Sequence, residues 1–321
     1  MSAPAASSTV RLALCQLLCG SGDKAADTAR ALAAIAEAAG PRGRAQIVAL
    51  PECWNSPYAT SAFGAYAEAI PGGPSSAALS AAAREHKVFL VGGSMPERCG
   101  DAIYNTAVAF GPDGALLAKH RKMHLFDIDI PGRQVFKESD VLTAGPGAGG
   151  GAAGGAPAPP ALAMFDTPWG AVGLGVCYDL RFPYLTLLLR QAGAKLLLFP
   201  GAFNPTTGPA HWELLLRARA LDAQAYVAGV SPARAGGAGY QAYGHSTVTG
   251  PWGDVLATTG EAEATVFVDL DMARVDEVRA QIPVSRQVRD DVYALHLVDG
   301  GGAGADAAST TAAMRARATR S

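Results

Sequence analysis

The chain has 321 residues, of which 49% are hydrophobic and only 17% are charged. This composition supplies enough apolar surface for a sizeable core and excludes an intrinsically disordered protein. The net charge of −2 argues against a surface for nucleic acid, and no apolar run approaches the roughly 18 residues that a transmembrane helix needs. We therefore expect a protein that binds neither nucleic acid nor membranes.

Strand-like runs alternate with alanine-rich helical patterns along the chain. Hairpins are predicted at 111–114 (GPDG), 251–254 (PWGD) and 260–261 (GE). Because hairpins interrupt the alternation, the pattern predicts an α/β domain with mixed rather than purely parallel sheets. The predicted strands cover 10–16, 47–51, 88–92, 107–110, 115–118, 171–176, 195–199, 226–231, 247–250, 255–258 and 264–269, and the predicted helices cover 23–39, 76–85, 183–192 and 211–225.

Two segments differ in composition from the rest of the chain. Residues 145–160 (GPGAGGGAAGGAPAPP) and 299–321 are rich in small residues and cannot bury enough surface to offset the entropy of ordering them. We expect a flexible N-terminus over 1–9, one folded domain over 10–298 with 145–160 as a surface loop, and a flexible tail over 299–321. The loop matches GxGxxG, but no helix follows it, which argues against a dinucleotide site.

The five cysteines are widely spaced and include no CxxC pair, so they do not indicate a disulfide framework. The first residues, MSAPAASSTV, lack the charged and apolar regions of a secretory signal. We therefore expect a cytoplasmic protein, and the short, acid-free N-terminus leaves import into an organelle open.

Cys177 is the first candidate for chemistry, because it follows the apolar run AVGLGV and precedes a predicted helix. A turn from strand to helix exposes a side chain at the sheet edge, and helix N–H groups lower the pKa of a thiol. A buried structural cysteine is the alternative. A nucleophilic thiol needs a base, and six histidines keep a Cys–His pair open. Glu52 and Lys122 also follow predicted strands, although each could be a solvated surface charge.

Taken together and in this order, Glu52, Lys122 and Cys177 resemble the Glu–Lys–Cys triad of the nitrilase superfamily of carbon–nitrogen hydrolases. The wider resemblance is to the omega-amidase branch and covers about residues 10 to 298 without the glycine-rich insert. The matching stretches are LPECWNSPY (50–58), HRKMHLFDIDIPG (120–132), FKES (136–139), GLGVCYDLRFP (173–183), PGAFNPTTGPAHWELLLRARALD (200–222) and GHSTVTGPWGDV (244–255).

The resemblance implies a carbon–nitrogen hydrolase domain over 10–298 with a four-layer α-β-β-α sandwich of two mixed β-sheets. It also implies an amidohydrolase acting on linear amides. Cys177 would be the nucleophile that forms a thioester, Glu52 the general base, and Lys122 the stabiliser of the oxyanion, with the Tyr178 backbone N–H as a second donor. Glu138 matches a second family glutamate that lies near the lysine and helps to position the substrate or the base.

Omega-amidases hydrolyse the terminal amide of 2-oxoglutaramate or 2-oxosuccinamate to the 2-oxo dicarboxylate and ammonia. The implied substrate is therefore a 2-oxo dicarboxylic acid monoamide, whose distal carboxylate would pair with Arg181. A salt bridge near the helix start is the alternative role of Arg181. Phe203 and Thr207 match positions that contact the acyl part of the ligand, and Phe126 and Tyr178 would supply apolar walls.

Several alternatives are weighed against this interpretation. A deaminated-glutathione amidase shares the triad, whereas a true nitrilase carries Trp-Glu after the cysteine, where this chain has Tyr178-Asp179. A serine hydrolase elbow fails at Val248, and a non-catalytic binding protein would be expected to lack a triad member. We expect no cofactor, because the implied chemistry is addition, loss of ammonia and hydrolysis, and no metal, because His120 and His124 lack a third ligand. We expect His211 in a buried structural network. The resemblance implies a homodimer and leaves the physiological substrate open.

Overall fold

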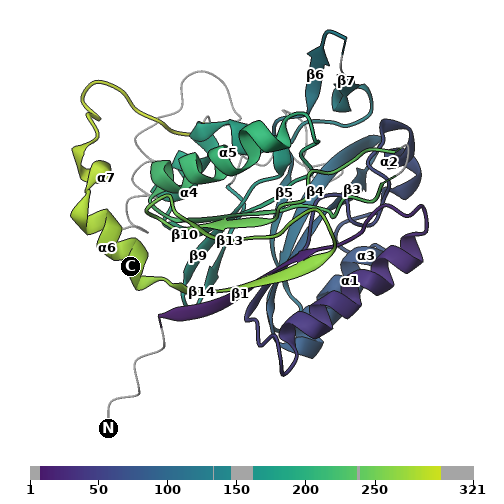
Figure 1. The fold of residues 1–321 in the computed structure, drawn as a ribbon, viewed down its shortest axis with the longest axis horizontal. Helices are drawn as coiled ribbons and strands as arrows, with labels where there is room; N and C mark the ends of the chain where they lie inside the picture. The colour runs from purple at the N-terminus through teal and green to yellow at the C-terminus, as the bar shows by residue number, and fades with distance from the viewer. Residues whose placement is uncertain (1–7, 133, 146–161, 237–238, 298–321) are drawn as a thin grey trace.

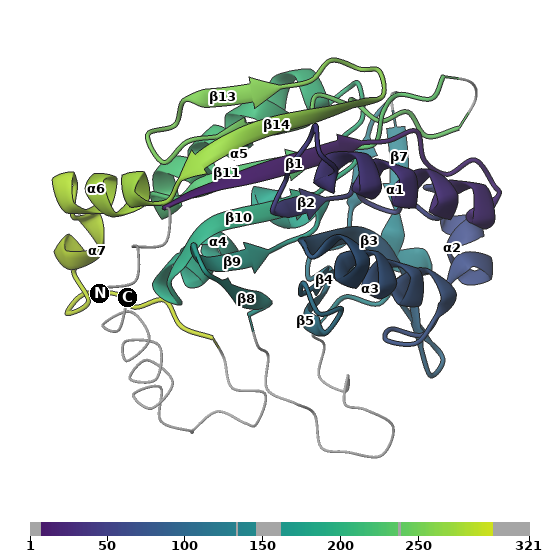
Figure 2. The same ribbon diagram turned by 90° about the horizontal axis from the view of Figure 1, so that it is seen from below.

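The computed structural model describes residues 8–132, 134–145, 162–236 and 239–297, and in this part of the chain two β-sheets lie face to face between two layers of helices (Figures 1 and 2). Each large sheet has six strands and contains both parallel and antiparallel pairs. The predicted four-layer α-β-β-α sandwich with mixed sheets is therefore confirmed.

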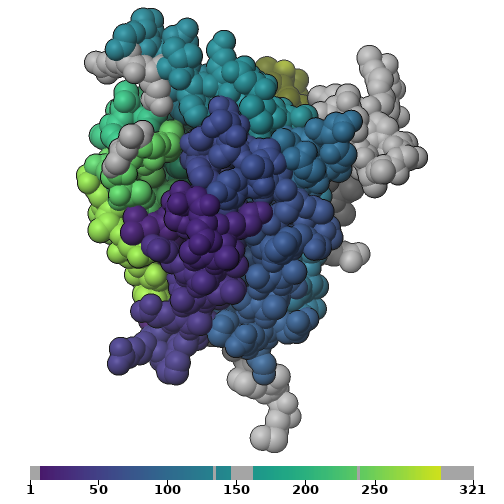
Figure 3. All heavy atoms as spheres, turned by 90° about the vertical axis from the view of Figure 1, so that its right-hand side faces the viewer, coloured from purple at the N-terminus to yellow at the C-terminus, as the bar shows by residue number. Residues whose placement is uncertain are grey.

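The first sheet has the order β14-β1-β2-β3-β4-β5. Strands β1, β2 and β3 run parallel, and the other neighbours run antiparallel. Helices α1 (Lys24–Ala39) and α3 (Pro74–His86) cover its outer face through buried Ile35 and Leu79, and Figure 3 shows this end of the molecule. The strands are β14 (Ala264–Asp271), β1 (Thr9–Gln16), β2 (Ile47–Ala49), β3 (Phe89–Cys99), β4 (Ala102–Phe110) and β5 (Leu116–Arg121).

The second sheet has the order β13-β12-β11-β10-β9-β8. Strands β9, β10 and β11 form its parallel centre. Helices α4 (Pro183–Gln191) and α5 (Gly208–Ala223) cover its outer face, where Leu189 and Trp212 pack on Phe199. The strands are β13 (Val255–Thr258), β12 (Thr247–Thr249), β11 (Tyr226–Val230), β10 (Ala194–Pro200), β9 (Gly170–Leu174) and β8 (Met164–Thr167).

The layer between the sheets is the largest apolar core of the molecule. Leu14 and Val91 from the first sheet meet Leu174 and Leu198 from the second, and all four are fully buried. Burial of one leucine stabilises a fold by about 1.5–3 kcal/mol, so the two sheets hold each other firmly. Their carboxyl-terminal edges are thereby fixed relative to one another.

The sequence missed several smaller elements. They are α2 (Thr60–Tyr66), the hairpin of β6 (Asp127–Ile130) and β7 (Gln134–Lys137), strand β8, the 3-10 helices η1 (Glu138–Asp140) and η2 (Cys177–Arg181), and α6 (Ala273–Gln281) with α7 (Val284–Gln287). The predicted hairpins at 111–114 and 251–254 are confirmed as β4–β5 and β12–β13. The hairpin predicted at 260–261 is wrong, because the chain crosses there from β13 in the second sheet to β14 in the first. Strand β14 pairs along eight residues with β1, and this pairing satisfies its backbone hydrogen bonds.

Within the described ranges, no helix combines the length and the apolar character needed to span a membrane. The segments predicted to be flexible fall outside the described residues, apart from residues 8, 9 and 145.

Candidate active site

Four predicted site residues meet in one buried cluster at the carboxyl-terminal edges of the strands. Glu52 follows β2, Lys122 follows β5, and Cys177 follows β9, while Glu138 begins η1 after β7. Their exposed fractions are 1%, 0%, 3% and 0%, respectively. The alternative of solvated surface charges is therefore wrong for Glu52 and Lys122.

Lys122 lies between the two glutamates. Its Nζ donates to Glu52 Oε1 at 3.0 Å and to Glu138 Oε1 at 2.9 Å. Burial alone would lower the pKa of Lys122, but the charges of Glu138 and Glu52 outweigh it and raise that pKa well above its usual value. The side chain is therefore an ammonium with three N–H donors, of which the two glutamates occupy two.

Glu52 is held by donors from three parts of the chain. Besides Lys122, Asn105 Nδ2 donates to its Oε1 at 2.8 Å, and the Ala202 backbone N–H donates to its Oε2 at 2.8 Å. Burial raises the pKa of Glu52, and the charge of Glu138 adds to this shift, while Lys122 and a hydrogen bond with the Cys177 thiol oppose it. A carboxylate with a raised pKa beside a thiol is suited to accept its proton.

The Glu138 carboxylate accepts two hydrogen bonds besides the one from Lys122. Its Oε1 also accepts a hydrogen bond from Tyr58 Oη at 2.8 Å, and its Oε2 accepts one from the Phe126 backbone N–H at 2.7 Å. Because Tyr58 and the Phe126 N–H hold this buried carboxylate in place, its hydrogen bond with Lys122 fixes the position of the ammonium.

Cys177 opens η2 with a φ of +47°, a conformation that is uncommon for residues other than glycine. Gly201 faces it, and a Cβ on Gly201 would come within 3.1 Å of the Cys177 Cα. Burial and the charge of Glu52 raise the pKa of the Cys177 thiol well above its usual value. The expectation of a lowered thiol pKa is thus wrong, because burial beside carboxylates outweighs the amides of one short helical turn.

A narrow pocket opens beside the thiol. All five residues predicted to bind the substrate line it together with Cys177 and Ala202, and they are Phe126, Tyr178, Arg181, Phe203 and Thr207. Its volume is about 10 Å³, which is room for roughly one water molecule. An amide can therefore enter only if the aromatic side chains of the lining move.

Arg181 brings a positive charge to this pocket. Its guanidinium lies 4.7 Å from the ring centre of Phe203 and 5.5 Å from that of Tyr178. No ion pair joins it to a carboxylate within the described ranges, so the alternative of a structural salt bridge finds no support there. Burial lowers its pKa. An anion in the pocket would relieve the cost of holding this cation out of water.

His211 contacts Arg181 through its Nδ1, which lies 3.2 Å from a terminal guanidinium nitrogen. Because a guanidinium only donates hydrogen bonds, Nδ1 must be the unprotonated nitrogen. The expectation that His211 is buried is wrong, because it is exposed on the first turn of α5. Its neighbour Trp212 is buried and donates to the His245 carbonyl.

Sequence reasoning missed Asn105, Tyr58 and Tyr240 as site residues. Asn105 lies on β4, and the Tyr58 ring, whose hydroxyl donates to Glu138, lies tilted against the Tyr240 ring with 4.5 Å between their centres. None of them carries a charge or forms part of a motif with chemistry of its own. Tyr58 could have been predicted, because it ends the stretch LPECWNSPY, which matches the family and contains Glu52.

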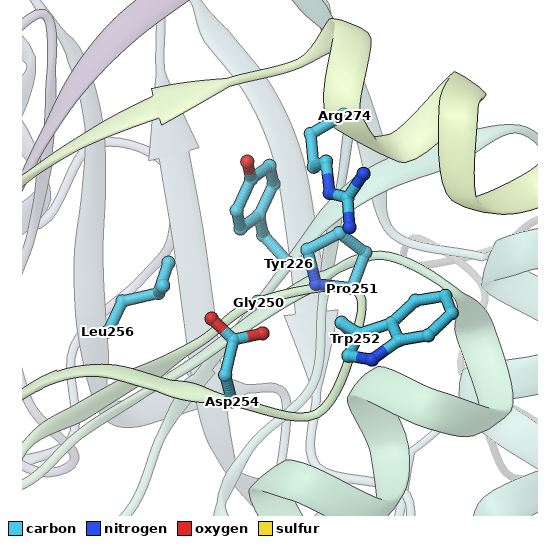
Figure 4. Close-up of a pocket in the computed structure, with 7 residues that line it drawn as sticks. All are labelled: Tyr226, Gly250, Pro251, Trp252, Asp254, Leu256 and Arg274. Atoms are coloured by element: carbon cyan, nitrogen blue, oxygen red, sulfur yellow. The ribbon is translucent and has the colours of Figure 1, made fainter.

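A second, larger cavity of about 230 Å³ lies between the β12–β13 turn, β11 and α6 (Figure 4). Trp252 and Arg274 flank it in Figure 4, and the Tyr226 hydroxyl donates to the Asp271 carbonyl at 2.9 Å. No cysteine, serine or histidine lines it. Although it is larger than the pocket beside Cys177, it offers no thiol, serine hydroxyl or imidazole.

Among the residues that the structure describes, no group of three His, Cys, Asp or Glu side chains could hold a metal ion. The chemistry available in the cluster is that of a thiol, a carboxylate base and a buried ammonium, which are the parts needed for acyl transfer.

Comparisons with known proteins show which family this chain resembles. The model of the carbon–nitrogen hydrolase family matches residues 11–280. The omega-amidase NIT2 of Homo sapiens is 52% identical over 287 residues, 89% of this chain and 98% of that protein, and its Danio rerio counterpart is 48% identical over 294 residues, 92% and 100%. The crystal structure of Saccharomyces cerevisiae Nit3, a nitrilase superfamily member, has a TM-score of 0.77 and 38% identity, with 90% of this chain and all of that chain covered.

Proposed function

The chain belongs to the carbon–nitrogen hydrolase family, and from this premise we propose that it is an omega-amidase that releases ammonia from 2-oxo dicarboxylic acid monoamides. The enzyme is an amidohydrolase, like the relatives with which it shares about half of its sequence. The observation that carries the substrate proposal is Arg181: a cation without a carboxylate partner in the described part of the chain lines the same pocket as Cys177. A distal substrate carboxylate would complete that ion pair.

In the first half of the reaction, Glu52 takes the proton of the Cys177 thiol while the sulfur attacks the amide carbon. The carbonyl oxygen becomes anionic, and the third N–H of Lys122 and the Tyr178 backbone N–H donate to it. Tyr178 lies in the first turn of η2, where N–H groups have no acceptor within the helix. The C–N bond then breaks, Glu52 passes its proton to the nitrogen, and ammonia leaves behind a thioester on Cys177.

In the second half, Glu52 is again a carboxylate and takes a proton from water as the water oxygen attacks the thioester carbon. The carbon–sulfur bond breaks, the proton returns to the sulfur, and the dicarboxylate leaves. Both halves need the same base and the same oxyanion donors. Because Lys122 stays positively charged throughout, it offsets the charge of whichever anion forms beside it.

A deaminated-glutathione amidase is the competing assignment within the family. The runs HLFDIDIPG (124–132) and AFNPTTGPAHW (202–212) favour the omega-amidase, as does the identity of about half of the sequence to omega-amidases.

We further propose that the enzyme is a cytoplasmic homodimer. Exposed apolar side chains on α4 and α5 support an interface on this face, with Tyr184 68% exposed and Leu214 64%. The described cysteines are all free thiols, which fits a reducing compartment. Sedimentation equilibrium should give twice the chain mass, and a monomer at micromolar concentration would refute the dimer.

Ammonia release across a small panel tests the activity: 2-oxoglutaramate, 2-oxosuccinamate, deaminated glutathione and a neutral amide of similar length. We expect the two monoamides to have the highest kcat/KM. Arg181→Leu should raise KM for them by about 30-fold, the scale of a lost charge-assisted pair, and should change KM for the neutral amide far less. Equal effects on both classes would refute the role of Arg181, and a preference for deaminated glutathione would favour the competing assignment.

A further inference from the structure

Asp179 lies two residues after the nucleophile, and its carboxylate is fully buried. Oδ2 accepts hydrogen bonds from the Val176 backbone N–H at 2.9 Å and from His120 Nε2 at 2.8 Å. Oδ1 accepts them from the His124 backbone N–H at 3.0 Å and from His124 Nδ1 at 2.7 Å. The carboxylate thus accepts four hydrogen bonds, one from Val176 just before it in the chain and three from His120 and His124.

The protonation states follow from these contacts. Although burial opposes it, the hydrogen bonds from His120 and His124 hold the pKa of Asp179 well below that of an ordinary aspartate. An ionised carboxylate can only accept hydrogen bonds, so His120 carries a proton on Nε2 and His124 carries one on Nδ1. Neither nitrogen is free to act as a base toward the substrate while it donates to Asp179.

The two histidines flank the catalytic lysine. His120 lies on β5 one residue before Arg121, and His124 follows Lys122 by two positions. On the other side, Val176 immediately precedes Cys177, whose φ of +47° must be maintained by its surroundings. Asp179 is therefore the link between the segment that carries the ammonium and the turn that carries the thiol.

We propose that Asp179 is a positioning residue that aligns Lys122 with Cys177 for acyl transfer, acting through His120 and His124. This inference rests on the proposed thiol chemistry but does not depend on which amide is the substrate. Asp179 does not line the pocket beside the thiol. Its effect should therefore appear in the chemical step, where an offset of about 1 Å can cost a factor of about 100 in rate.

Substrate binding should be affected less, because the far end of the same turn has its own anchor. Arg219 Nε donates to the Leu180 carbonyl at 2.9 Å, immediately before Arg181. The Arg219 side chain is buried on α5, which packs on the second sheet. Loss of the Asp179 contacts would therefore loosen Cys177 and leave Arg181 tethered.

The first variant is Asp179→Asn, which keeps the size of the side chain but places an amide donor against two N–H groups. We expect kcat for the best amide of the panel to fall by about 100-fold, with KM changed by less than about 3-fold. Glu68→Gln is the matched control, because Glu68 is also buried and accepts hydrogen bonds from Lys24, Ser75 and Ser76, on the helical side of the first sheet. It should lower Tm without lowering kcat.

Paired histidine variants separate positioning from simple packing. His120→Gln and His124→Asn each keep an N–H donor near the original nitrogen, whereas His120→Leu and His124→Leu keep only the bulk. We expect the amide variants to retain kcat within about 5-fold and the leucine variants to approach the loss seen in Asp179→Asn. Retention by Gln or Asn would also show that the histidines transfer no proton.

Two results would overturn the inference: a kcat within about 2-fold of wild type for Asp179→Asn, or leucine variants as active as the amide variants. The first of these results overturns the inference whether or not KM rises. If the wild-type enzyme prefers an amide without a distal carboxylate, the proposed substrate fails, while the ratio of kcat values on that amide still decides the role of Asp179.

Discussion

Two ionic clusters built on buried carboxylates include residues at the end of β5, and they differ in the ratio of their charges. In the first, one carboxylate meets two cations: Glu97 accepts two hydrogen bonds from Arg121, both at 2.8 Å, and one from Lys119 at 2.9 Å. In the second, one cation meets two carboxylates: Lys122 contacts Glu52 and Glu138. Arg121 and Lys122 are neighbours in the chain, yet they belong to different clusters.

The charge ratio changes the acidity of the carboxylates. Burial opposes ionisation in both clusters, but the hydrogen bonds from Arg121, Thr106 and Lys119 outweigh it and lower the pKa of Glu97. One lysine shared with Glu138 does not outweigh it at Glu52, whose pKa is raised. The carboxylate with two cations therefore has a lowered pKa, whereas Glu52 keeps a raised pKa, which suits the role of base proposed for it.

Exchanging the cations of the two clusters should have the largest effect. Lys122→Arg keeps the positive charge, but the planar guanidinium cannot aim one N–H at each glutamate and a third at the oxyanion. We expect kcat to fall by about 10²–10³-fold, the scale of a lost oxyanion donor, in steady-state ammonia assays. Arg121→Lys is the control and should stay within about 3-fold of wild type. If both exchanges cost the same, the clusters are not functionally distinct.

Removing one negative charge from the reactive cluster should move its pH profile. Activity requires ionised Glu52, so kcat/KM should fall as the pH drops through the raised pKa of that residue. The charge of Glu138 raises the pKa of Glu52, and Glu138→Gln should therefore move the acid limb to lower pH. The position of the limb, measured by ammonia release, is independent of any loss in maximal rate. A limb that moves to higher pH would contradict this assignment.

The smallest effect on activity is expected for Glu97→Gln, which should act on stability. The folded-state pKa of Glu97 is lowered, so its stabilisation is present above the ordinary glutamate pKa and is lost as the pH falls through the lowered value. Chemical denaturation should give a loss of about 2 kcal/mol in the free energy of unfolding at pH 7. The difference from wild type should shrink near pH 3; a constant difference would show that charge is not the cause.

The sequence predicted which residues meet in the buried cluster better than it predicted the groups that hold them there. Cys177, Glu52 and Lys122 each follow a strand whose apolar run is visible in the sequence, and the family resemblance put them in order. The donors that hold the Glu52 carboxylate in place are different, because Asn105 and the Ala202 backbone lie 53 and 150 residues away from it. Only the packing of the two sheets brings them together, and no local pattern encodes that contact.

Local signals also misled where long-range pairing decided the outcome. Gly260-Glu261 has the composition of a turn, but β14 joins the first sheet because β1 offers it an eight-residue partner. His211 begins a helix beside the buried Trp212, yet the helix turns it outward to Arg181. In both cases the residue types indicated a local structure, but they did not indicate the distant partner, β1 for β14 and Arg181 for His211.

The measurement that tests the central claim most directly is the initial rate of ammonia release from 2-oxoglutaramate by Cys177→Ala. Cys19→Ala is the matched control, because Cys19 is a partly buried thiol outside the reactive cluster. We predict that Cys177→Ala stays folded and loses at least about 10⁴-fold in rate, while Cys19→Ala keeps the wild-type rate. Turnover by folded Cys177→Ala at a rate near that of the control would contradict thiol catalysis and, with it, the role assigned to the carboxylate-rich cluster.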